Sequence, residues 1–361
     1  MPPKKSRQLA RLRELCALEL PTALLMPSIL AELHALVPSS RNLFDWCDDL
    51  GRLTQYYIEG PVDLRIAQLY FEEFHNRRER EAMPGFAQAV RGPALIHGAA
   101  ELNTPRFFNS ALYAEIWRPQ GFRYRVEAIV RGARQRPLGS LVLYRAPGER
   151  CFTPAEEAVL PQVLPYLAQA LQRDAAVRSS RPDQWVPAPE PAQTLLLEPS
   201  GTIRLASDGA PRLLKLADAG LHVQGAGPAV ELTLQALCAE AQTIGQARRE
   251  LHSPWGRFEF SAQRLHAVDP QAQRSVTPSW IQVQLRRQEP RELADERRLA
   301  ALELSSGQAA VCRLLLQGHA GPEVARRLAV APSTVVDHTR KLYQRLGVRS
   351  VRELVERVRS G

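Results

Sequence analysis

Side chains that could contact nucleic acid recur with helical spacing near the carboxyl end of this 361-residue chain. Arg340 and Lys341 can donate hydrogen bonds to guanine or to phosphate oxygens, and Asp337 can accept one from the N4 amino group of cytosine. Val336 can contact the methyl group of thymine. These residue types at this spacing predict a surface that contacts the major groove of double-stranded DNA.

The helix that must present these side chains has one apolar face. Its stripe repeats every three or four residues and consists of Val335, Thr339, Leu342 and Leu346. Such a stripe packs against a core, so the opposite face stays exposed. At the start of the helix, Ser333 and Thr334 are short enough for close approach, and the free N–H groups of the first turn could bind a phosphate.

Further helices around this one have their own start and stop signals. Two capping boxes, two prolines at first helical positions and glycines at helix ends divide residues 304–361 into four helices. The connection over residues 328–331 has the length of the turn in a DNA-binding helix-turn-helix. The residues that carry these signals are Ser305, Gln308, Gly318, Pro322, Pro332, Gly347, Ser350 and Glu353.

Positive charge is concentrated in the same segment. The whole chain has a formal net charge of +9. Residues 304–361 contain ten Arg or Lys side chains against four Asp or Glu, which gives a net charge of +6. A basic segment attracts the phosphate backbone, so the distribution of charge favours nucleic-acid binding by this part of the chain.

These residues resemble the LuxR-type helix-turn-helix. The resemblance is carried by Leu304-Ser-x-x-Gln308, Leu314-Leu-x-Gln-Gly318, Glu323-Val-Ala-x-Arg-Leu328, Ser333-Thr-Val-x-x-His338, Leu342-x-x-Arg-Leu-Gly-Val348, Ser350 and Glu353-Leu354. It implies that Val336, Asp337 and Arg340 face bases. It also implies that Thr334, His338 and Lys341, with Ser333, face the DNA backbone. It also implies a homodimer that is held by the last helix through Val351, Leu354, Val355 and Val358. RNA polymerase is a further partner to be expected for such a regulator.

The segment departs from the common LuxR pattern at several positions. Val336 stands where relatives often carry Lys, and Asp337 stands where they often carry a neutral residue. Ala331 replaces a usual Ser and is a weaker helix cap. Ser306 and Gly307 replace a usual Pro-Arg pair. We therefore expect a DNA site that differs from those of better-known relatives.

Three alternatives compete with a sequence-specific transcription regulator. The helix-turn-helix could serve mainly for dimerisation in a ligand-sensing adaptor that acts through protein contacts. The segment could also be a sigma-factor-like module, although no upstream stretch is rich in exposed aromatic residues, as a promoter-melting helix is. The third alternative is a three-helix module that binds no DNA.

Two junctions divide the rest of the chain. Residues 179–192 form a proline-rich linker, because four prolines within ten residues favour an extended chain. The Glu289-Pro290 junction precedes a charged stretch that predicts a connecting helix over residues 289–303. The expected domains are 1–178, 193–288 and 304–361.

Residues 1–178 have a mixed α+β pattern. We expect helices over 8–19, 27–36 and 63–80, strands over 107–117, 123–131 and 138–144, and a long helix that begins at Thr153 with Glu156 completing a capping box. The order of elements resembles a GAF-type sensory domain. Residues 193–288 resemble a PAS-type domain, with a hairpin over 194–206, a short helix capped by Asp208 and a strand over 280–285.

Aromatic residues of the first domain could line a pocket for a small organic ligand. They cluster around two expected strands and comprise Phe107, Phe108, Tyr113, Trp117, Phe122 and Tyr124. Aromatic pockets with a few polar tips suit such ligands. Ordinary core packing of the same side chains is the alternative.

Other classes of protein lack support in the sequence. The five cysteines are far apart and have no metal spacing, so we expect free thiols and neither a disulfide framework nor a zinc site. No catalytic motif, Walker A loop or receiver-domain acid cluster is present, and we expect no enzyme activity and no cofactor. No apolar run reaches the roughly 18–20 residues of a membrane span, and no export signal is evident, so we expect a cytoplasmic protein.

Overall fold

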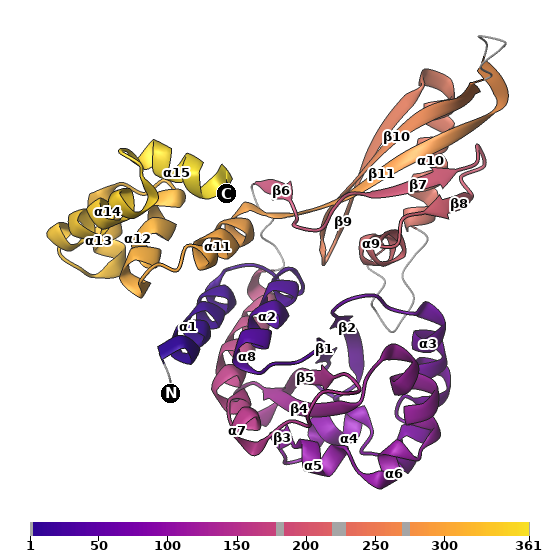
Figure 1. Cartoon of the computed structure of the whole chain (residues 1–361), viewed down its shortest axis with the longest axis horizontal. Coiled ribbons are helices and arrows are strands. Elements are labelled where there is room, and N and C mark those ends of the chain that lie inside the picture. The colour runs from indigo at the N-terminus through magenta and orange to yellow at the C-terminus, as the bar shows by residue number, and fades with distance from the viewer. Residues whose placement is uncertain (1–2, 178–183, 219–228, 269–274, 361) are drawn as a thin grey trace. The chain divides into compact units, whose positions relative to one another are not determined.

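The computed structural model describes residues 3–177, 184–218, 229–268 and 275–360 (Figure 1). Contacts divide the chain into two compact units. The first unit comprises Met1–Arg181 and Pro187–Glu289 and contains two β-sheets with their helices. The second unit comprises Pro182–Val186 and Pro290–Gly361 and is mainly helical. The expected sequence of mixed α and β structure followed by a helical C-terminal domain is therefore observed.

The first sheet is antiparallel and has the strand order β2-β1-β5-β4-β3. Its central strands correspond to the strands predicted over 123–131 and 138–144. The five strands are β1 (Arg41–Cys47), β2 (Leu53–Ile58), β3 (Ile96–His97), β4 (Tyr124–Arg131) and β5 (Pro137–Arg145), with the 3₁₀ turn η5 (Ala133–Gln135) between the last two.

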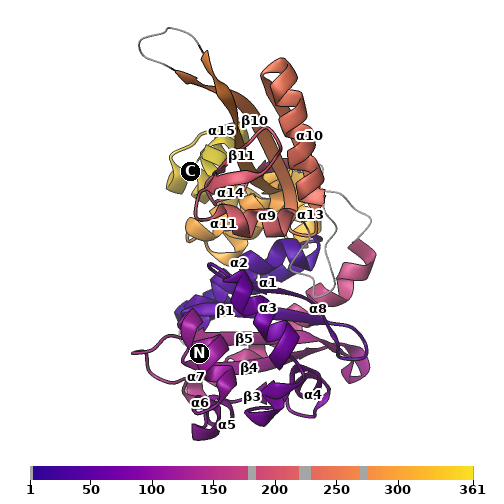
Figure 2. The ribbon, with the colours of Figure 1, turned by 90° about the vertical axis from the view of Figure 1, so that its right-hand side faces the viewer.

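Helices cover both faces of this sheet. On one side lie α1 (Pro3–Ala17), α2 (Thr22–Leu36) and α8 (Leu160–Val177), and α2 contacts β1 while α8 contacts β4 (Figures 1 and 2). The other side carries a series of short helices: α3 (Leu64–Leu69), η1 (Tyr70–Phe74), η2 (Arg78–Glu81), α4 (Phe86–Arg91), α5 (Ala99–Leu102), α6 (Pro105–Phe108), η3 (Tyr113–Trp117) and η4 (Arg118–Gln120).

The strand predicted over residues 107–117 is wrong, because this stretch is helical. Thr104 caps α6 by accepting a hydrogen bond from the N–H of Phe107 at 3.2 Å, and Pro105 occupies the first turn. The hydroxyl of Ser110 then accepts a hydrogen bond from the N–H of Tyr113 at 3.2 Å. These side chains satisfy the backbone donors that open each helical turn. The single helix predicted over 63–80 is likewise divided into α3, η1 and η2.

The capping box predicted at Thr153 is confirmed, but the helix behind it is short. Glu156 and Thr153 satisfy each other's backbone N–H groups, and α7 spans only Pro154–Glu157. A new helix, α8, begins at Leu160. Pro161 explains the break, because proline has no N–H and its ring clashes with the carbonyl four residues before, here that of Glu157.

The second sheet repeats the antiparallel order of the first, as β8-β7-β11-β10-β9. Its strands are β7 (Gln193–Leu197), β8 (Ile203–Ala206), β9 (Gln246–Ser253), β10 (Gly256–Val268) and β11 (Ser275–Pro290), with the short β6 (Trp185–Pro187) and the helices α9 (Ala210–Ala217) and α10 (Ala229–Ile244). Buried and more exposed residues alternate along β7, with Leu195 and Leu197 inside. The cap predicted at Asp208 is wrong: the N-cap residue of α9 is Gly209, and no side chain caps the helix.

The second unit contains α11 (Arg291–Ala301), α12 (Ser306–Leu316), α13 (Gly321–Leu328), α14 (Pro332–Leu346) and α15 (Val351–Ser360). Helix α11 matches the connecting helix predicted from the charged stretch after Pro290. It is part of the unit rather than a free connection, because Leu299 packs into the core and Glu296 forms an ion pair with Arg313 of α12.

Candidate nucleic-acid interface and ligand cavity

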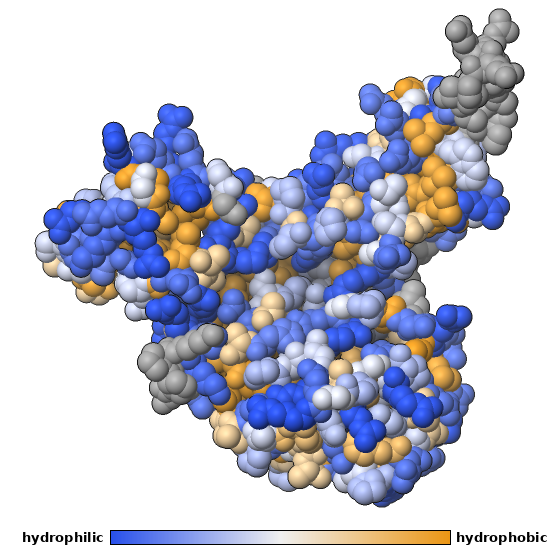
Figure 3. All heavy atoms as spheres, in the orientation of Figure 1, coloured by the Kyte–Doolittle hydropathy of each residue, from blue (hydrophilic) through white to orange (hydrophobic). Residues whose placement is uncertain are grey.

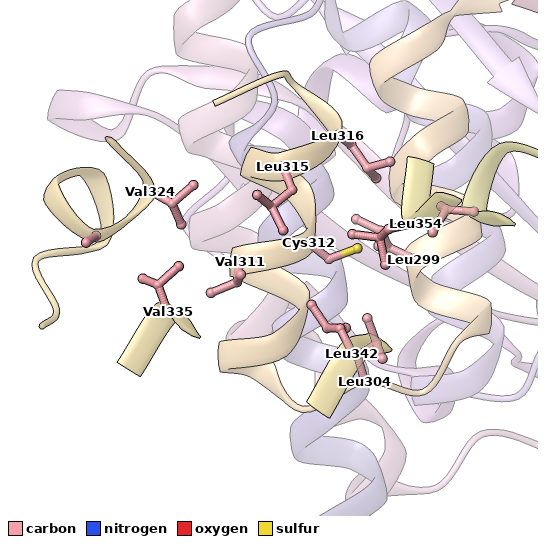
Figure 4. Packing of buried hydrophobic residues seen from close by; sticks show 12 residues of the cluster. Leu299, Leu304, Val311, Cys312, Leu315, Leu316, Val324, Val335, Leu342 and Leu354 are labelled. Carbon is pink, nitrogen blue, oxygen red and sulfur yellow. The ribbon is translucent and has the colours of Figure 1, made fainter. Parts of the chain in front are cut away.

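One apolar core fixes the orientation of α14 in the second unit. Val335 and Leu342 are buried in it beside Val311 and Cys312 of α12, and Leu346 packs partly against it (Figure 4). Thr339, also predicted on this face, is half-buried and donates a hydrogen bond to the carbonyl of Val335 at 2.8 Å. The predicted stripe therefore faces the core, and the opposite face of α14 is free to meet a partner.

The turn between α13 and α14 brings the start of α14 to the surface. Ala329 adopts a left-handed conformation at the end of α13, with φ 53° and ψ 43°. Ala331 is the N-cap residue of α14 and makes no side-chain cap, as its residue type predicts. Ser333 and Thr334 are exposed in the first turn. The N–H groups of Thr334 and Val335 already donate to the carbonyl of Ala331, so they are not free to hold a phosphate.

The predicted base-facing residues lie on the exposed face of α14. Val336 is 67% exposed, and Arg340 and Lys341 are also exposed. Asp337 connects the two cations: one of its oxygens lies 3.1 Å from Nη2 of Arg340, and the other lies 2.7 Å from Nζ of Lys341. The hydrogen bond from Lys341 is the main cause that lowers the pKa of Asp337. In the free protein this carboxylate thus neutralises part of the charge that would meet DNA.

His338 has a different position from the one expected for a residue that faces the DNA backbone. It is half-buried, and a Cβ atom built on Gly307 would lie only 2.9 Å from its Nε2. Its Nδ1 is buried without a hydrogen-bond partner. The imidazole therefore packs over the first turn of α12, and the glycine is what makes room for it. Gly307 was visible in the sequence as a departure from the LuxR pattern, but not its connection to His338.

The residues predicted for a dimer contact on α15 do not share one environment. Leu354 and Val358 belong to the core of the unit, with 0% and 2% exposure, and Val355 packs partly against that core. Only Val351 is open to solvent, with 40% exposure. Arg359 ties the end of this helix to Asp295 of α11 at 3.0 Å. Leu354 and Val358 stabilise the fold of the unit and are not available as surface residues.

Hydrophilic residues gather over the region of α13 and α14 on the face that Figure 3 shows. Arg326 and Arg327 of α13 are both paired with Glu323, Arg327 at 2.7 Å. Arg345 and Arg349 lie at the far end of α14 and beyond it, exposed and without an ion-pair partner within the described residues. In the sequence, Arg345 belongs to the LuxR-type pattern, whereas nothing pointed to Arg349.

The first unit contains a cavity of about 120 Å³ between the first sheet and its short helices. Of the aromatic residues predicted to line a pocket, Trp117 and Phe122 do so. Phe107 and Tyr113 are buried in the adjoining core, with Phe108 packed against it, and Tyr124 is half-buried outside the cavity wall. Sequence reasoning missed the polar lining, which comprises Asp45, Tyr56, Tyr70, His75, Glu79, Gln120, Arg125, Glu127 and Tyr144.

The remaining predictions concern thiols, metals and membranes. All five cysteines are free, and burial raises the pKa of Cys16, Cys47 and Cys312 to about 12. Thiols with such pKa values are not nucleophiles at neutral pH. The residues that the structure describes contain no group of three His, Cys, Asp or Glu placed to hold a metal ion. None of the helices within the described ranges is long and apolar enough to cross a membrane.

Comparison with known proteins places the helical unit in a family. Residues 302–358 match the family model described as bacterial regulatory proteins, luxR family. The C-terminal segment is therefore a LuxR-family domain, as its sequence motifs predict. The match covers about a sixth of the chain and leaves the two sheets of the first unit outside it. No curated protein matches the chain.

Solved structures show only a distant likeness. The VqmA dimer of Vibrio cholerae, solved in the absence of target DNA, is 14% identical over 47% of this chain and 82% of its own, with a TM-score of 0.20. VqmA bound to DPO is 16% identical over 47% of this chain and 82% of its own, with a TM-score of 0.19. The DhaR(N)–DhaL complex of E. coli is 12% identical over 78% and 86%, with a TM-score of 0.26. At these scores the likeness carries no conclusion about fold or function.

Proposed function

We propose that the protein is a homodimeric transcription regulator that binds double-stranded DNA through α14 and responds to a small molecule bound in the first unit. The observation that carries the proposal is the exposed face of α14 within a LuxR-family domain. Val336, Asp337, Arg340 and Lys341 lie together on that face, opposite the buried Val335 and Leu342. GAF-like and PAS-like sensory roles for the two sheets belong to the same proposal.

The chemistry of this face fits a major groove. Arg340 can donate two parallel hydrogen bonds to O6 and N7 of guanine, which is the commonest specific contact of arginine with a base. Asp337 can accept from N4 of a neighbouring cytosine once its own cations turn to the DNA. Lys341, Ser333 and Thr334 would contact phosphates, which fix the position of the helix without selecting a sequence. His338 would reach a phosphate only after leaving its place beside Gly307.

Selection of DNA sequences by the purified full-length protein tests the proposal. We expect enrichment of an inverted repeat whose half-sites lie about one helical turn apart, because a two-fold dimer presents two α14 helices. Sequencing of the bound fraction after several rounds is the measurement. If no sequence is enriched at moderate salt, while the protein still forms dimers, the helix-turn-helix serves dimerisation and the protein is an adaptor.

The dimer itself is a separate part of the proposal. Val351 is the exposed apolar residue of α15, and a second copy of α15 could cover it. Val351→Arg would place two charges opposite each other in such a contact. We expect this variant to sediment as a monomer in analytical ultracentrifugation and to lose affinity for a full inverted repeat. Arg352→Gln, at the neighbouring exposed position, is the matched control, and a Val351→Arg variant that remains dimeric would place the contact elsewhere.

A further inference from the structure

Arg125 is a buried cation without an anionic partner in the described part of the chain. It lies on β4, is 4% exposed, and lines the cavity of the first unit. Its guanidinium lies over the rings of Trp117 and Phe107, with 5.0 and 5.5 Å to the ring centroids. Nε and Nη2 of Arg125 have no hydrogen-bond partner within the described residues, and no carboxylate there forms an ion pair with this side chain. Aromatic faces attract a cation but accept none of its N–H groups in the way an anion does.

Carboxylates lie at another part of the same cavity. Glu79 already accepts three hydrogen bonds, from the N–H groups of Asn76 and Phe86 and from the hydroxyl of Tyr70. Glu127 accepts one bond, from the hydroxyl of Ser140 at 2.6 Å. Asp45 accepts none within the described residues, and burial, together with Glu127 and Glu79, raises its pKa well above the usual range. Glu127 and Asp45 thus retain capacity for a hydrogen-bond donor.

Strand register separates the cation from these acids along the sheet. Tyr144 of β5 pairs with Arg125, Val142 pairs with Glu127, and Ser140 pairs with Asp45 on the other neighbour. The three positions of β5 lie on one face of the sheet, because side chains alternate along a strand. Along that face Arg125 comes first, Glu127 second and Asp45 third. The cavity therefore offers an anion site at one end and a cation site toward the other.

We propose that this cavity binds a free amino acid, whose carboxylate meets Arg125 and whose ammonium group meets Glu127 and Asp45. The apolar remainder of such a ligand would lie against Trp117, Phe122 and Val142. A cavity of about 120 Å³ is many times the roughly 10–15 Å³ that one water needs. The proposal rests on the sensory role proposed above and names the chemical class of the signal.

Calorimetric titration of the full-length protein with the proteinogenic L-amino acids, one at a time, tests this assignment. For the tightest-binding amino acid, two analogues follow: the acid that lacks the amine and the amine that lacks the carboxylate. We expect each analogue to bind roughly 10- to 100-fold more weakly, as the loss of hydrogen bonds to a charged group produces. Binding of no amino acid, or equal binding of either analogue, would overturn the proposal.

Two variants test which end of the cavity binds the carboxylate of the ligand and which end binds its ammonium group. Arg125→Met should weaken binding of the amino acid and of the acid analogue, and leave binding of the amine analogue unchanged. Glu127→Gln, which can keep its bond to Ser140, should weaken binding of the amino acid and of the amine analogue, and leave the acid analogue unchanged. Arg123→Gln is the matched control, since Arg123 is half-buried against Phe108 outside the cavity wall.

Thermal unfolding without ligand distinguishes a ligand site from a structural arginine. Removal of a buried charge that lacks a partner should leave the melting temperature of Arg125→Met equal to that of the wild type or higher. A lower melting temperature together with unchanged amino-acid affinity would make Arg125 a structural residue and overturn the assignment. DNA selection without added ligand is independent of this result, so failure here would leave the DNA-binding proposal intact.

Discussion

Arg125 in the cavity and Arg340 on α14 have the same charge but differ in burial and in pairing. Arg125 is almost fully buried and has unpartnered N–H groups, whereas Arg340 is exposed and already paired with Asp337 of its own helix. A buried cation without an anion costs free energy until a partner arrives, so such a site selects for a compact ligand that enters the protein. An exposed, paired cation costs little and can exchange its carboxylate for a phosphate or a base. The difference separates the proposed site for a small molecule from the proposed surface for DNA.

The largest predicted effect comes from making a second buried cation unpaired. Arg145 and Glu156 are both buried and lie 2.9 Å apart, and the guanidinium also donates to the carbonyl of Pro38. Glu156→Gln should lower the free energy of unfolding by about 3–5 kcal/mol, the usual cost of breaking a buried pair from one side. Denaturation by urea, monitored at the first unfolding transition, measures this loss of free energy.

The same pair predicts a dependence on pH. Although burial acts to raise it, the hydrogen bonds from Arg145 and Thr153 lower the pKa of Glu156 to about 2. A carboxylate with a lowered pKa stabilises the folded state fully above its ordinary pKa, and this stability is lost as the pH falls toward the folded value. The difference in the free energy of unfolding between wild type and Glu156→Gln should therefore become smaller as the pH falls from about 4.5 to 2. A difference that stays constant across that interval would contradict the role given to this ion pair.

Substitution of the exposed cations of α14 should change DNA binding and leave the stability of the fold unchanged. Arg340→Ala should lower discrimination at one base pair of each half-site by about 1–3 kcal/mol. Lys341→Ala should weaken binding to all sequences alike and reduce the slope of log affinity against log salt by about 0.9. Fluorescence anisotropy with the selected site and its single-base variants measures both. Arg352→Ala, paired with Glu356 on α15, is the control.

Removal of the Asp337 carboxylate would leave Arg340 and Lys341 without an anionic partner, as Arg125 is, although they would remain exposed. Asp337→Asn should tighten binding to random DNA several-fold at low salt, because Arg340 and Lys341 are then free to meet phosphates. It should also reduce any preference for cytosine at the position next to the guanine that Arg340 contacts. Since the pKa of Asp337 is lowered, chiefly by the hydrogen bond from Lys341, the carboxylate is ionised throughout the neutral range and the effect should be the same at pH 6 and pH 8. Weaker binding of the variant would show that Asp337 orients the cations productively.

The smallest expected effect concerns the helix that carries these charges. Ala331 has the extended backbone of an N-cap residue but no side-chain acceptor. Ala331→Ser should raise the stability of the second unit by about 0.5–1 kcal/mol, since a serine oxygen can accept from the first turn. If affinity follows charge and not helix stability, the Kd for DNA should be unchanged. Thermal unfolding and anisotropy together check the two halves of this expectation.

The helical unit was more predictable from sequence than the cavity because its signals are local. Ser305 and Gln308 do form the predicted capping box, and Gly347 does end α14 in a left-handed conformation. Each of these features depends on residues within a few positions of one another. The orientation of His338 escaped prediction because it depends on Gly307, which is distant in sequence.

The cavity could not be predicted because strand pairing assembles it. Asp45 and Arg125 are eighty positions apart in the chain and come together only through their common neighbour β5. The aromatic stretch from Phe107 to Trp117 gave a false strand, since its spacing suits a strand while Thr104 and Ser110 cap helical turns. Trp117 and Phe122, which precede β4 in the chain, do line the cavity. The polar groups beside them carried no local signal.

The close packing of Gly307 and His338 couples two positions that 30 residues separate in the chain. A Cβ atom at position 307 would lie 2.9 Å from Nε2 of His338. A larger side chain there would therefore push the imidazole out of its present place. A substitution in α12 would in this way change what α14 presents on its surface without altering any residue of α14.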